Sequence, residues 1–370
     1  MVGRAMNRFL ARDRRVQSFF CTISSGCVAL VLLAGILTVS AQEPSVPELL
    51  WKVKLKGAIL SPPAVVDTQL VVPMTDRKVY RINSRNGQWA VIGKVNGTVT
   101  VTPKMETNRL FLSMASERKK DMQAVVAYSL APWKRVWHWS LPNSSSTPLL
   151  YGETLYIGSE DGSLYALSTA TGETRWRFRT ARAVRSSPVM ADSVLFIGSD
   201  DHRVYAVQAK DGKELWSYKT QGGVMAAPVI AGDAVYAVSY DQTLYCLDRV
   251  SGHLKWTFRT DGSLYGTPAV QGNRVFLGSN DRRVYCLDAD TGTVSWRYET
   301  KGVIRATPVV SGSVVYVVST DKQIYALNVQ TGNLVWRYET QGSLTVTPVI
   351  VGGVLIVGSE DRYLYAFREQ

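Results

Sequence analysis

The chain has 370 residues, 46% of them hydrophobic, with 10 tryptophans and a formal net charge of +12. This length and apolar content are enough for a large core, which excludes an intrinsically disordered chain. Only three histidines occur, and His138, His202 and His253 are irregularly spaced, so we predict no metal site.

The first 41 residues differ from the rest of the chain. Five arginines precede an apolar run over 28–39, and the small residues 39–41 match a signal-peptidase site. We interpret residues 1–41 as a signal peptide or, if uncleaved, as a signal anchor in which 19–39 spans a bilayer. Either alternative places the remaining chain outside the cytoplasm, in the periplasm or another extracytoplasmic space. Cleavage would leave 37 basic and 29 acidic residues, a net charge of +8.

After a linker over 42–50, a period of 40 residues organises the chain. Tyrosine, aspartate, tryptophan and proline each recur at this interval; the tyrosines are Tyr165, Tyr205, Tyr245, Tyr285, Tyr325 and Tyr365. A fixed period of this length indicates one supersecondary unit copied many times, each copy burying its apolar face against its neighbours.

One repeat, over 267–300, shows how each unit folds. Its short apolar runs are separated by turns rich in Gly, Asn and Asp, and we predict four strands over 267–270, 274–278, 284–287 and 294–298. Four antiparallel strands in about 40 residues form a propeller blade. We expect Gly292 to need a positive φ. The repeated aspartate, Asp281 here, is interpreted as a turn former and not as a metal ligand or catalytic group.

The repeat count predicts an all-β, eight-bladed propeller of four-stranded antiparallel blades over 51–370. Eight prolines mark the blades: Pro63, Pro103, Pro148, Pro188, Pro228, Pro268, Pro308 and Pro348. The eighth repeat contains only three strands, the last over 364–367, and residues 50–53 match a fourth. We therefore expect the N-terminal strand to complete the last blade and close the ring, so that loss of 51–55 would reopen it. We expect the protein to be a monomer.

Cys246 and Cys286 share one repeat position, which is Ala in other repeats. A position that alternates between Ala and Cys is typical of a small buried site. Equivalent strands of adjacent blades are too far apart for a disulfide, so we predict two buried thiols.

The segment Ala-Leu-Ser-Thr-Ala-Thr-Gly-Glu-Thr-Arg-Trp over 166–176 resembles the tryptophan-docking motif of the PQQ-like, or quinoprotein-type, β-propellers. The resemblance covers nearly all of 51–370 and implies that a tryptophan of each repeat packs between neighbouring blades: Trp51, Trp137, Trp176, Trp216, Trp256, Trp296 and Trp336. Val91 lies near the position of the tryptophan that would precede blade two, which we take as the least regular blade. Trp256→Ala should cost about 3–5 kcal/mol if the ring is fully buried.

This resemblance implies two alternatives for function. One is a dehydrogenase that holds pyrroloquinoline quinone and calcium at its centre. The other is a non-catalytic propeller, whose nearest analogue is the B component of the machine that inserts β-barrels into bacterial outer membranes. The chain has minimal repeats, no adjacent cysteines and no haem-attachment motif, so we expect no cofactor and no enzyme. A quinone-dependent oxidoreductase, or a sensor of small anionic ligands in the central channel, remains the alternative.

Candidate binding residues precede each inner strand. Three positions before the marker prolines, the side chains vary between repeats, as expected at a surface: Arg185, Met225, Tyr265, Arg305 and Thr345. Arg185 and Arg305 lie three blades apart, about 135° around the ring. They could hold an anion from opposite sides, or line a channel filled with water only.

The turns between second and third strands form a second candidate surface. Their cations are Arg77, Lys78, Arg203, Arg282, Arg283, Lys322 and Arg362, offset by the repeated aspartates. This face is either a docking site or a solvated rim. Residues 117–121, which lengthen the second repeat, are another candidate contact site.

We therefore predict an exported, non-catalytic protein-interaction scaffold of the cell envelope, with outer-membrane protein assembly as the role nearest to the resemblance. Its partner is expected to be an envelope protein. Export and the absence of a patch of one sign disfavour nucleic-acid binding, so we expect no nucleic-acid partner. Membrane association is expected only through an uncleaved N-terminal segment or through a partner.

Overall fold

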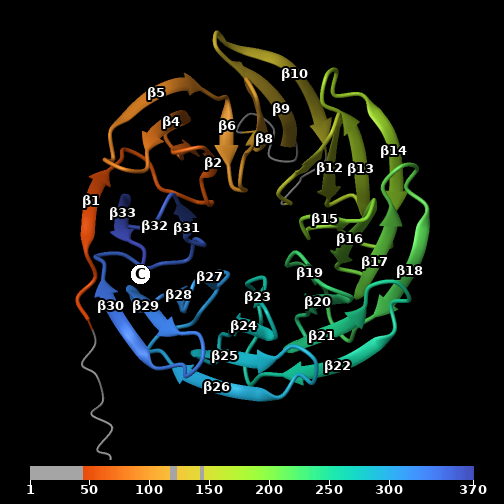
Figure 1. Cartoon of the computed structure of the whole chain (residues 1–370). Helices are drawn as coiled ribbons and strands as arrows, with labels where there is room; N and C mark the ends of the chain where they lie inside the picture. Colours follow the sequence, from red (N-terminus) through yellow and green to blue (C-terminus); the bar gives the residue numbers. More distant parts are fainter. Residues whose placement is uncertain (1–44, 117–122, 142–145) are drawn as a thin grey trace, which may run out of the picture. The chain divides into compact units, whose positions relative to one another are not determined.

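The computed structural model describes residues 45–116, 123–141 and 146–370. The signal segment and the 117–121 excursion lie outside the described residues. Pro44–Gln370 form one compact unit. Its regular structure is entirely β, in eight sheets that follow one another around a ring (Figure 1). The all-β, eight-bladed prediction is confirmed.

Each blade is an antiparallel meander whose strands follow in order from the centre of the ring outward (Figure 1). The inner strands are β2 (Ala64–Val66), β7 (Lys104–Glu106), β11 (Leu149–Tyr151), β15 (Val189–Ala191), β19 (Val229–Ala231), β23 (Ala269–Gln271), β27 (Val309–Ser311) and β31 (Val349–Val351). The second strands are β3 (Gln69–Pro73), β8 (Arg109–Ser116), β12 (Thr154–Ser159), β16 (Val194–Ser199), β20 (Ala234–Val238), β24 (Arg274–Gly278), β28 (Val314–Val318) and β32 (Val354–Gly358).

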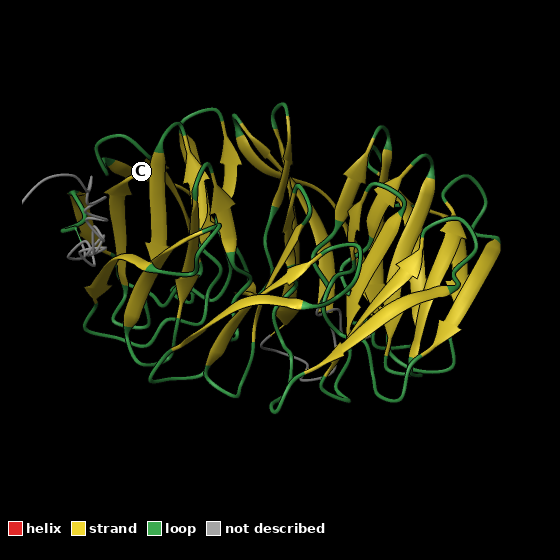
Figure 2. Cartoon of the chain, turned by 60° about the horizontal axis from the view of Figure 1, so that its bottom comes forward, coloured by secondary structure: helices red, strands yellow, loops and turns green. Residues whose placement is uncertain are grey.

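The two remaining positions complete the blades. The third strands are β4 (Lys78–Asn83), β9 (Gln123–Leu130), β13 (Ser163–Ser168), β17 (Arg203–Gln208), β21 (Thr243–Asp248), β25 (Arg283–Asp288), β29 (Gln323–Asn328) and β33 (Tyr363–Arg368). The outer strands are β5 (Trp89–Lys94), β10 (Trp133–Leu141), β14 (Thr174–Arg179), β18 (Glu214–Lys219), β22 (Leu254–Arg259), β26 (Val294–Glu299), β30 (Leu334–Glu339) and β1 (Leu49–Lys54). Figure 2 shows these strands running between two faces, with loops gathered at both ends.

Blade two is the exception to the four-strand pattern. An additional strand, β6 (Gly97–Val99), pairs with residues 114–116 at the C-terminal end of β8, whereas β7 pairs with residues 109–111 at its N-terminal end. The longest strand pair of the ring, β9 with β10, belongs to the same blade. Blade two is therefore the least regular blade, as its sequence indicated.

The ring is closed by pairing strands from opposite ends of the sequence. β1 pairs antiparallel with β33, and Lys52 lies opposite Tyr365. The pairing extends to an ion pair, in which Arg368 Nε lies 2.6 Å from Glu48 Oε2. The predicted completion of blade eight by the N-terminal strand is confirmed.

The core lies between blades and not within them. Every residue of the second strand β20 is buried, because one face of its sheet contacts the preceding blade and the other contacts the next. In one apolar cluster, Tyr236 and Val238 of blade five pack with Val275 and Leu277 of blade six. A single repeat therefore cannot bury its own apolar surface.

The indole of an outer-strand tryptophan joins most neighbouring pairs of blades. Trp256 Nε1 donates to the carbonyl of Ala289, at 2.9 Å, in the turn between the third and outer strands of blade six. The ring lies against Gly292, where a Cβ atom would come within 2.5 Å of it. The same contact recurs for Trp51, Trp137, Trp176, Trp216 and Trp296. Trp256 itself is half-buried, so the condition for the full 3–5 kcal/mol loss is not met there.

Two junctions depart from this pattern. Between blades seven and eight, Trp336 is fully buried, but its Nε1 has no hydrogen-bond partner among the described residues. Blade eight lacks the connecting turn that supplies the carbonyl elsewhere, because β33 and β1 come from opposite ends of the sequence. Between blades one and two, Trp133 of the second blade packs back against Gly93 of the first. Its Nε1 donates to Lys94 O, which compensates for Val91 in the usual tryptophan position.

The repeated aspartate links the blades on the opposite face of the ring. Asp281 Oδ1 accepts the N–H of Arg283 in its own turn, and Oδ2 accepts the hydroxyl of Tyr285. Oδ2 also accepts the N–H of Asp261, from the link that arrives from blade five. The turn-forming role predicted from sequence is confirmed, and the contact with the arriving link is an addition.

Both cysteines of the described chain are free and buried. Burial raises the pKa of the Cys246 thiol to about 11, which keeps it protonated near neutral pH. The prediction of two buried thiols is confirmed.

Gly292→Ala should destabilise the protein more than Gly272→Ala. Both glycines have positive φ, 71° and 55°, so both variants carry backbone strain of about 1 kcal/mol. A Cβ atom at 272 meets open space, whereas one at 292 collides with the indole of Trp256. We expect a total loss of about 3 kcal/mol for Gly292→Ala, measured by urea denaturation. Equal losses would show that the indole contact contributes nothing.

The buried tyrosines should make stability fall in alkaline solution. Burial and then the hydrogen bond to Asp281 raise the pKa of Tyr285 to about 12, from about 10 in an unfolded chain. The neutral phenol is favoured by folding, so its contribution is complete below pH 10 and is lost as pH rises through 12. In Tyr285→Phe, the free energy of unfolding should therefore decline less between pH 10 and 12. Parallel profiles for the two proteins, measured by chemical denaturation, would contradict this assignment.

Candidate functional site

The links that lead into the inner strands lie around the centre of the ring (Figure 1), and they share one face with the turns between second and third strands. In an antiparallel meander these turns share a face with the links between blades. Each link is fixed to its own blade, since the N–H of Tyr240 donates to Gly223 O and that of Asn280 to Ser263 O. We define the inner rim as Glu160, Arg185, Asp200, Tyr240, Tyr265 and Arg305.

An ion triad occupies the part of the inner rim between blades three and four. Arg185 Nη1 lies 2.7 Å from Asp200 Oδ2 in its own blade, and its Nε lies 3.2 Å from Glu160 Oε1 in the preceding blade. Burial raises the pKa of Asp200, and the Arg185 guanidinium opposes that rise. The charge of Arg185 is thus offset by two carboxylates.

An aromatic cluster occupies the next part of the inner rim. The rings of Tyr240 and Tyr265 lie 5.5 Å apart, and both side chains are more than two-fifths exposed. The guanidinium of Arg305 lies 5.7 Å from the centre of the Tyr265 ring. Burial is also the main cause that raises the pKa of Tyr240. Two exposed phenols and a stacked arginine form an amphipathic surface.

The five residues predicted from sequence therefore do not share one environment. Arg185 is in the ion triad, while Tyr265 and Arg305 are in the aromatic cluster. Met225 is half-buried, and Thr345 Oγ1 donates to Glu360 at 3.2 Å. The structure does not bring Arg185 and Arg305 together on one group.

Sequence reasoning missed Glu160, Asp200 and Tyr240. They occupy the position directly before the repeated aspartate, where the other repeats have Asn280, Thr320 and Glu360. The variation at this position matches the variation three residues before the prolines. This variation between repeats was the sequence signal from which the three residues could have been identified.

The basic turn residues are partly neutralised. Arg283 lies 2.8 Å from Asp261 and 3.3 Å from Glu299, and Lys78 lies 4.0 Å from Asp76. Arg77, Arg282, Lys322 and Arg362 have positive φ at their turns and are exposed. This face carries both signs of charge.

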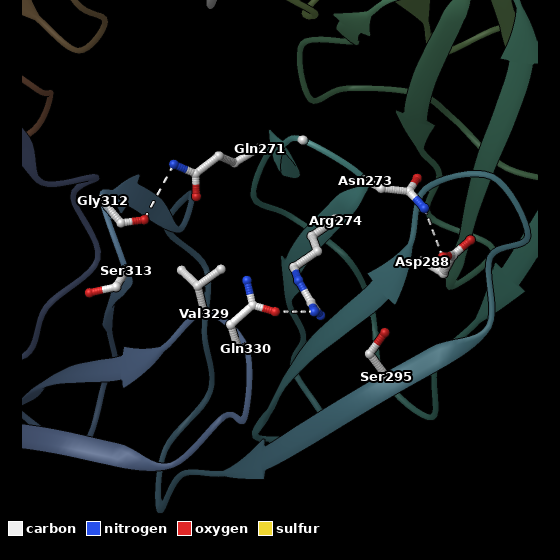
Figure 3. Close-up of a pocket in the computed structure, with 10 residues that line it drawn as sticks. Gln271, Asn273, Arg274, Asp288, Ser295, Gly312, Ser313, Val329 and Gln330 are labelled. Carbon is white, nitrogen blue, oxygen red and sulfur yellow. Dashed lines mark hydrogen bonds between the residues drawn. The ribbon is translucent and has the colours of Figure 1, made fainter.

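The opposite face, formed by the remaining turns of the meanders, has a pocket of about 510 Å³ between blades six and seven (Figure 3). Arg274, Asp288, Gln271 and Gln330 are among its lining residues. Sequence reasoning missed this pocket as well, because Gln271 and Gln330 do not recur with the repeat and Arg274 recurs only as Arg109.

Among the described residues, no group of three or more His, Cys, Asp and Glu side chains is placed to hold a metal ion. No helical segment in that part of the chain has the length and hydrophobicity needed to span a membrane.

Comparisons with known proteins agree with this architecture. The model of a family described as outer membrane protein assembly factor BamB matches residues 92–178, 160–266 and 259–370. The crystal structure of BamB from Moraxella catarrhalis superposes with a TM-score of 0.73 at 18% identity, covering 87% of this chain and 100% of that one. The computationally designed Ika8 protein gives a TM-score of 0.73 at 16% identity, covering 87% and 99%. No curated protein matches the chain.

Arg185→Ala should destabilise the protein in a pH-dependent way. At pH 7 the variant leaves two adjacent carboxylates without their shared cation, at a cost of about 1 kcal/mol for a group so exposed. The pKa of Asp200, already raised by burial, should rise further without the guanidinium, so the cost should shrink as the pH is lowered from 7 to 4 and Asp200 becomes increasingly protonated. Denaturation of wild type and variant across this range measures the difference.

Arg305→Ala is the matched control, because no carboxylate partner of Arg305 is found in the described part of the chain. Its effect on stability should not vary between pH 7 and pH 4. A pH-independent cost for Arg185→Ala would contradict the triad.

Proposed function

We propose that this chain, which belongs to the family of the outer membrane protein assembly factor BamB, is an exported, non-catalytic scaffold that docks an envelope protein through its inner rim. Its place is the extracytoplasmic side of the cell envelope, and its role is the assembly of outer-membrane proteins. The family supports the assembly role. The inner rim supports the docking surface.

The observation that carries the proposal is the aromatic cluster. Tyr240 and Tyr265 are 41% and 45% exposed, on a ring whose other large aromatics are mostly buried between blades. Tyrosine and arginine are enriched in the energetically important centres of interfaces. Arg305 stacks on Tyr265, so a partner that covers the cluster meets an aromatic surface together with a positive charge that an acidic group can pair.

The ion triad provides a polar border to this cluster. Glu160 and Asp200 hold Arg185 in one orientation, so little side-chain entropy would be lost when a partner covers it. Repeats on either side of the rim are fixed by the tryptophan and aspartate contacts. The surface is therefore pre-organised, as expected for a docking platform.

The quinone alternative does not fit the residues at the rim. Pyrroloquinoline quinone carries several carboxylates, and Arg185 is already neutralised by Glu160 and Asp200. The calcium that accompanies it needs a group of oxygen ligands, which the described residues do not assemble from their acidic side chains. No catalytic step is assigned.

Site-specific photo-crosslinking in cells tests the proposal. A crosslinking residue at Tyr265 should give a discrete product with an outer-membrane assembly protein, identified by mass spectrometry. The same residue at Val250, which is 80% exposed in the turn before β22 on the opposite face, should not.

Tyr265→Ala with Arg305→Ala should weaken the purified complex about tenfold or more, since both lie at the centre of the proposed contact. The abundance of β-barrel proteins in the outer membrane should fall in parallel. Equal products from positions 265 and 250, or unchanged affinity in the double variant, would overturn the proposal.

A further inference from the structure

We propose that the pocket between blades six and seven is a binding site for a small monocarboxylate that carries hydroxyl groups, the chemistry of a sugar acid. This site lies on the face opposite the inner rim and is independent of the docking function. The pocket is about 510 Å³, within the range of small-ligand sites.

The inference begins with an arginine that the repeat does not explain. Arg274 is the first residue of β24, where the second strands of most other blades have small or aliphatic residues: Thr154, Val194, Ala234, Val314 and Val354. The fold therefore does not require an arginine at this position. The side chain points into the pocket, toward Gln330 of blade seven (Figure 3).

The partners of Arg274 are all neutral. One guanidinium nitrogen donates to Gln330 Oε1, and another lies 3.7 Å from Cys286 Sγ. Two other half-buried arginines contact carboxylates, Arg249 with Asp192 and Arg283 with Asp261. Arg109 and Arg203 pair with neutral oxygens, as Arg274 does, but neither of them lines this pocket. The charge of Arg274 is thus not compensated by direct contact within the described chain, and a planar carboxylate would match its paired donors.

Asp288 lines the same pocket but is committed to its own loop. It accepts hydrogen bonds from Asn273 Nδ2 at 2.9 Å and from the N–H groups of Asp290 and Thr291. The hydrogen bonds from Thr291 are the largest causes that lower its pKa, so Asp288 is ionised near neutral pH. A fixed negative charge at one side disfavours a phosphate dianion more strongly than a monocarboxylate.

The remaining lining groups suit hydroxyls. The hydroxyls of Ser295 and Ser313 and the amide nitrogen of Gln330 have no hydrogen-bond partner in the described part of the protein. Gln271 Nε2 makes one long hydrogen bond, 3.4 Å, to Gly312 O. These donors and acceptors line the same pocket as the guanidinium, as a polyhydroxylated body attached to a carboxylate would require.

Ligand-observed NMR with D-glucuronate tests the assignment on the folded protein. We expect saturable binding with a dissociation constant on the order of millimolar, as is usual for a small polar ligand. Arg274→Val carries the residue found at this position in blades seven and eight, so it should fold, and it should weaken binding about tenfold or more.

Arg109→Val is the matched control. Arg109 begins β8 at the same repeat position, and its guanidinium donates to Thr169 O, so this variant should bind glucuronate as the wild type does. Gln330→Ala, in an exposed turn, provides a second variant if Arg274→Val does not fold, and it should weaken binding as well.

Several results would overturn the assignment. If glucose bound with the same affinity as glucuronate, the carboxylate would have no role in recognition. If inorganic phosphate bound more tightly than glucuronate, the ligand would not be a monocarboxylate. If Arg274→Val and Gln330→Ala both bound glucuronate with the affinity of the wild type, the ligand would bind outside this pocket. Crosslinking at position 265 should be unchanged in Arg274→Val, which separates a failure of this site from a failure of the docking function.

Discussion

The structure depends on one constraint: a repeat of this kind has two apolar faces and can bury them only against its neighbours. The outer-strand indole fixes the distance between neighbouring blades through two contacts, one made by its N–H group and one made by its ring. Its N–H is paired to a carbonyl of the next blade, and its ring fills the space that the absence of a Cβ atom leaves at glycine. The aspartate that binds the arriving link does the same on the other face. Each blade is thereby held at two points outside its own sheet.

Most of the fold could be predicted from the sequence because the contacts between blades are copies of one contact. The spacing of proline, aspartate, tyrosine and tryptophan predicted the number of blades, the turns and the closure by β1. Strand ends differed slightly. The first strand of blade six begins at Ala269 and not at Thr267, as expected next to Pro268, which has no N–H to donate.

The candidate sites were harder to predict, for a physical reason. Arg185 could be placed on the rim from its position before Pro188, but its partners Glu160 and Asp200 lie 25 and 15 residues away, and one is on a different blade. Such contacts depend on how side chains from two repeats meet, which periodicity does not encode. The same holds for Trp133, whose ring replaces a missing tryptophan from the opposite direction. The side chains that give each candidate site its chemistry, such as Arg185, Tyr265 and Gln330, vary between repeats, and the repeat pattern therefore gives no information about them.

The discontinuous blade has a consequence for the order of the sequence itself. Residues 48 and 368 are hydrogen-bonded to each other. In other blades the equivalent residues, at the end of the third strand and before the outer strand, are hydrogen-bonded in the same way across the turn that connects them. A short engineered loop of the Asp-Thr-Gly type could join them, while a new opening is made in an exposed turn elsewhere. Such a loop would offer Trp336 the backbone carbonyl that its buried N–H lacks. Closure of the ring thus does not depend on which blade contains the break in the polypeptide. A circularly permuted chain should satisfy one more buried hydrogen-bond donor than the chain in its natural sequence order does.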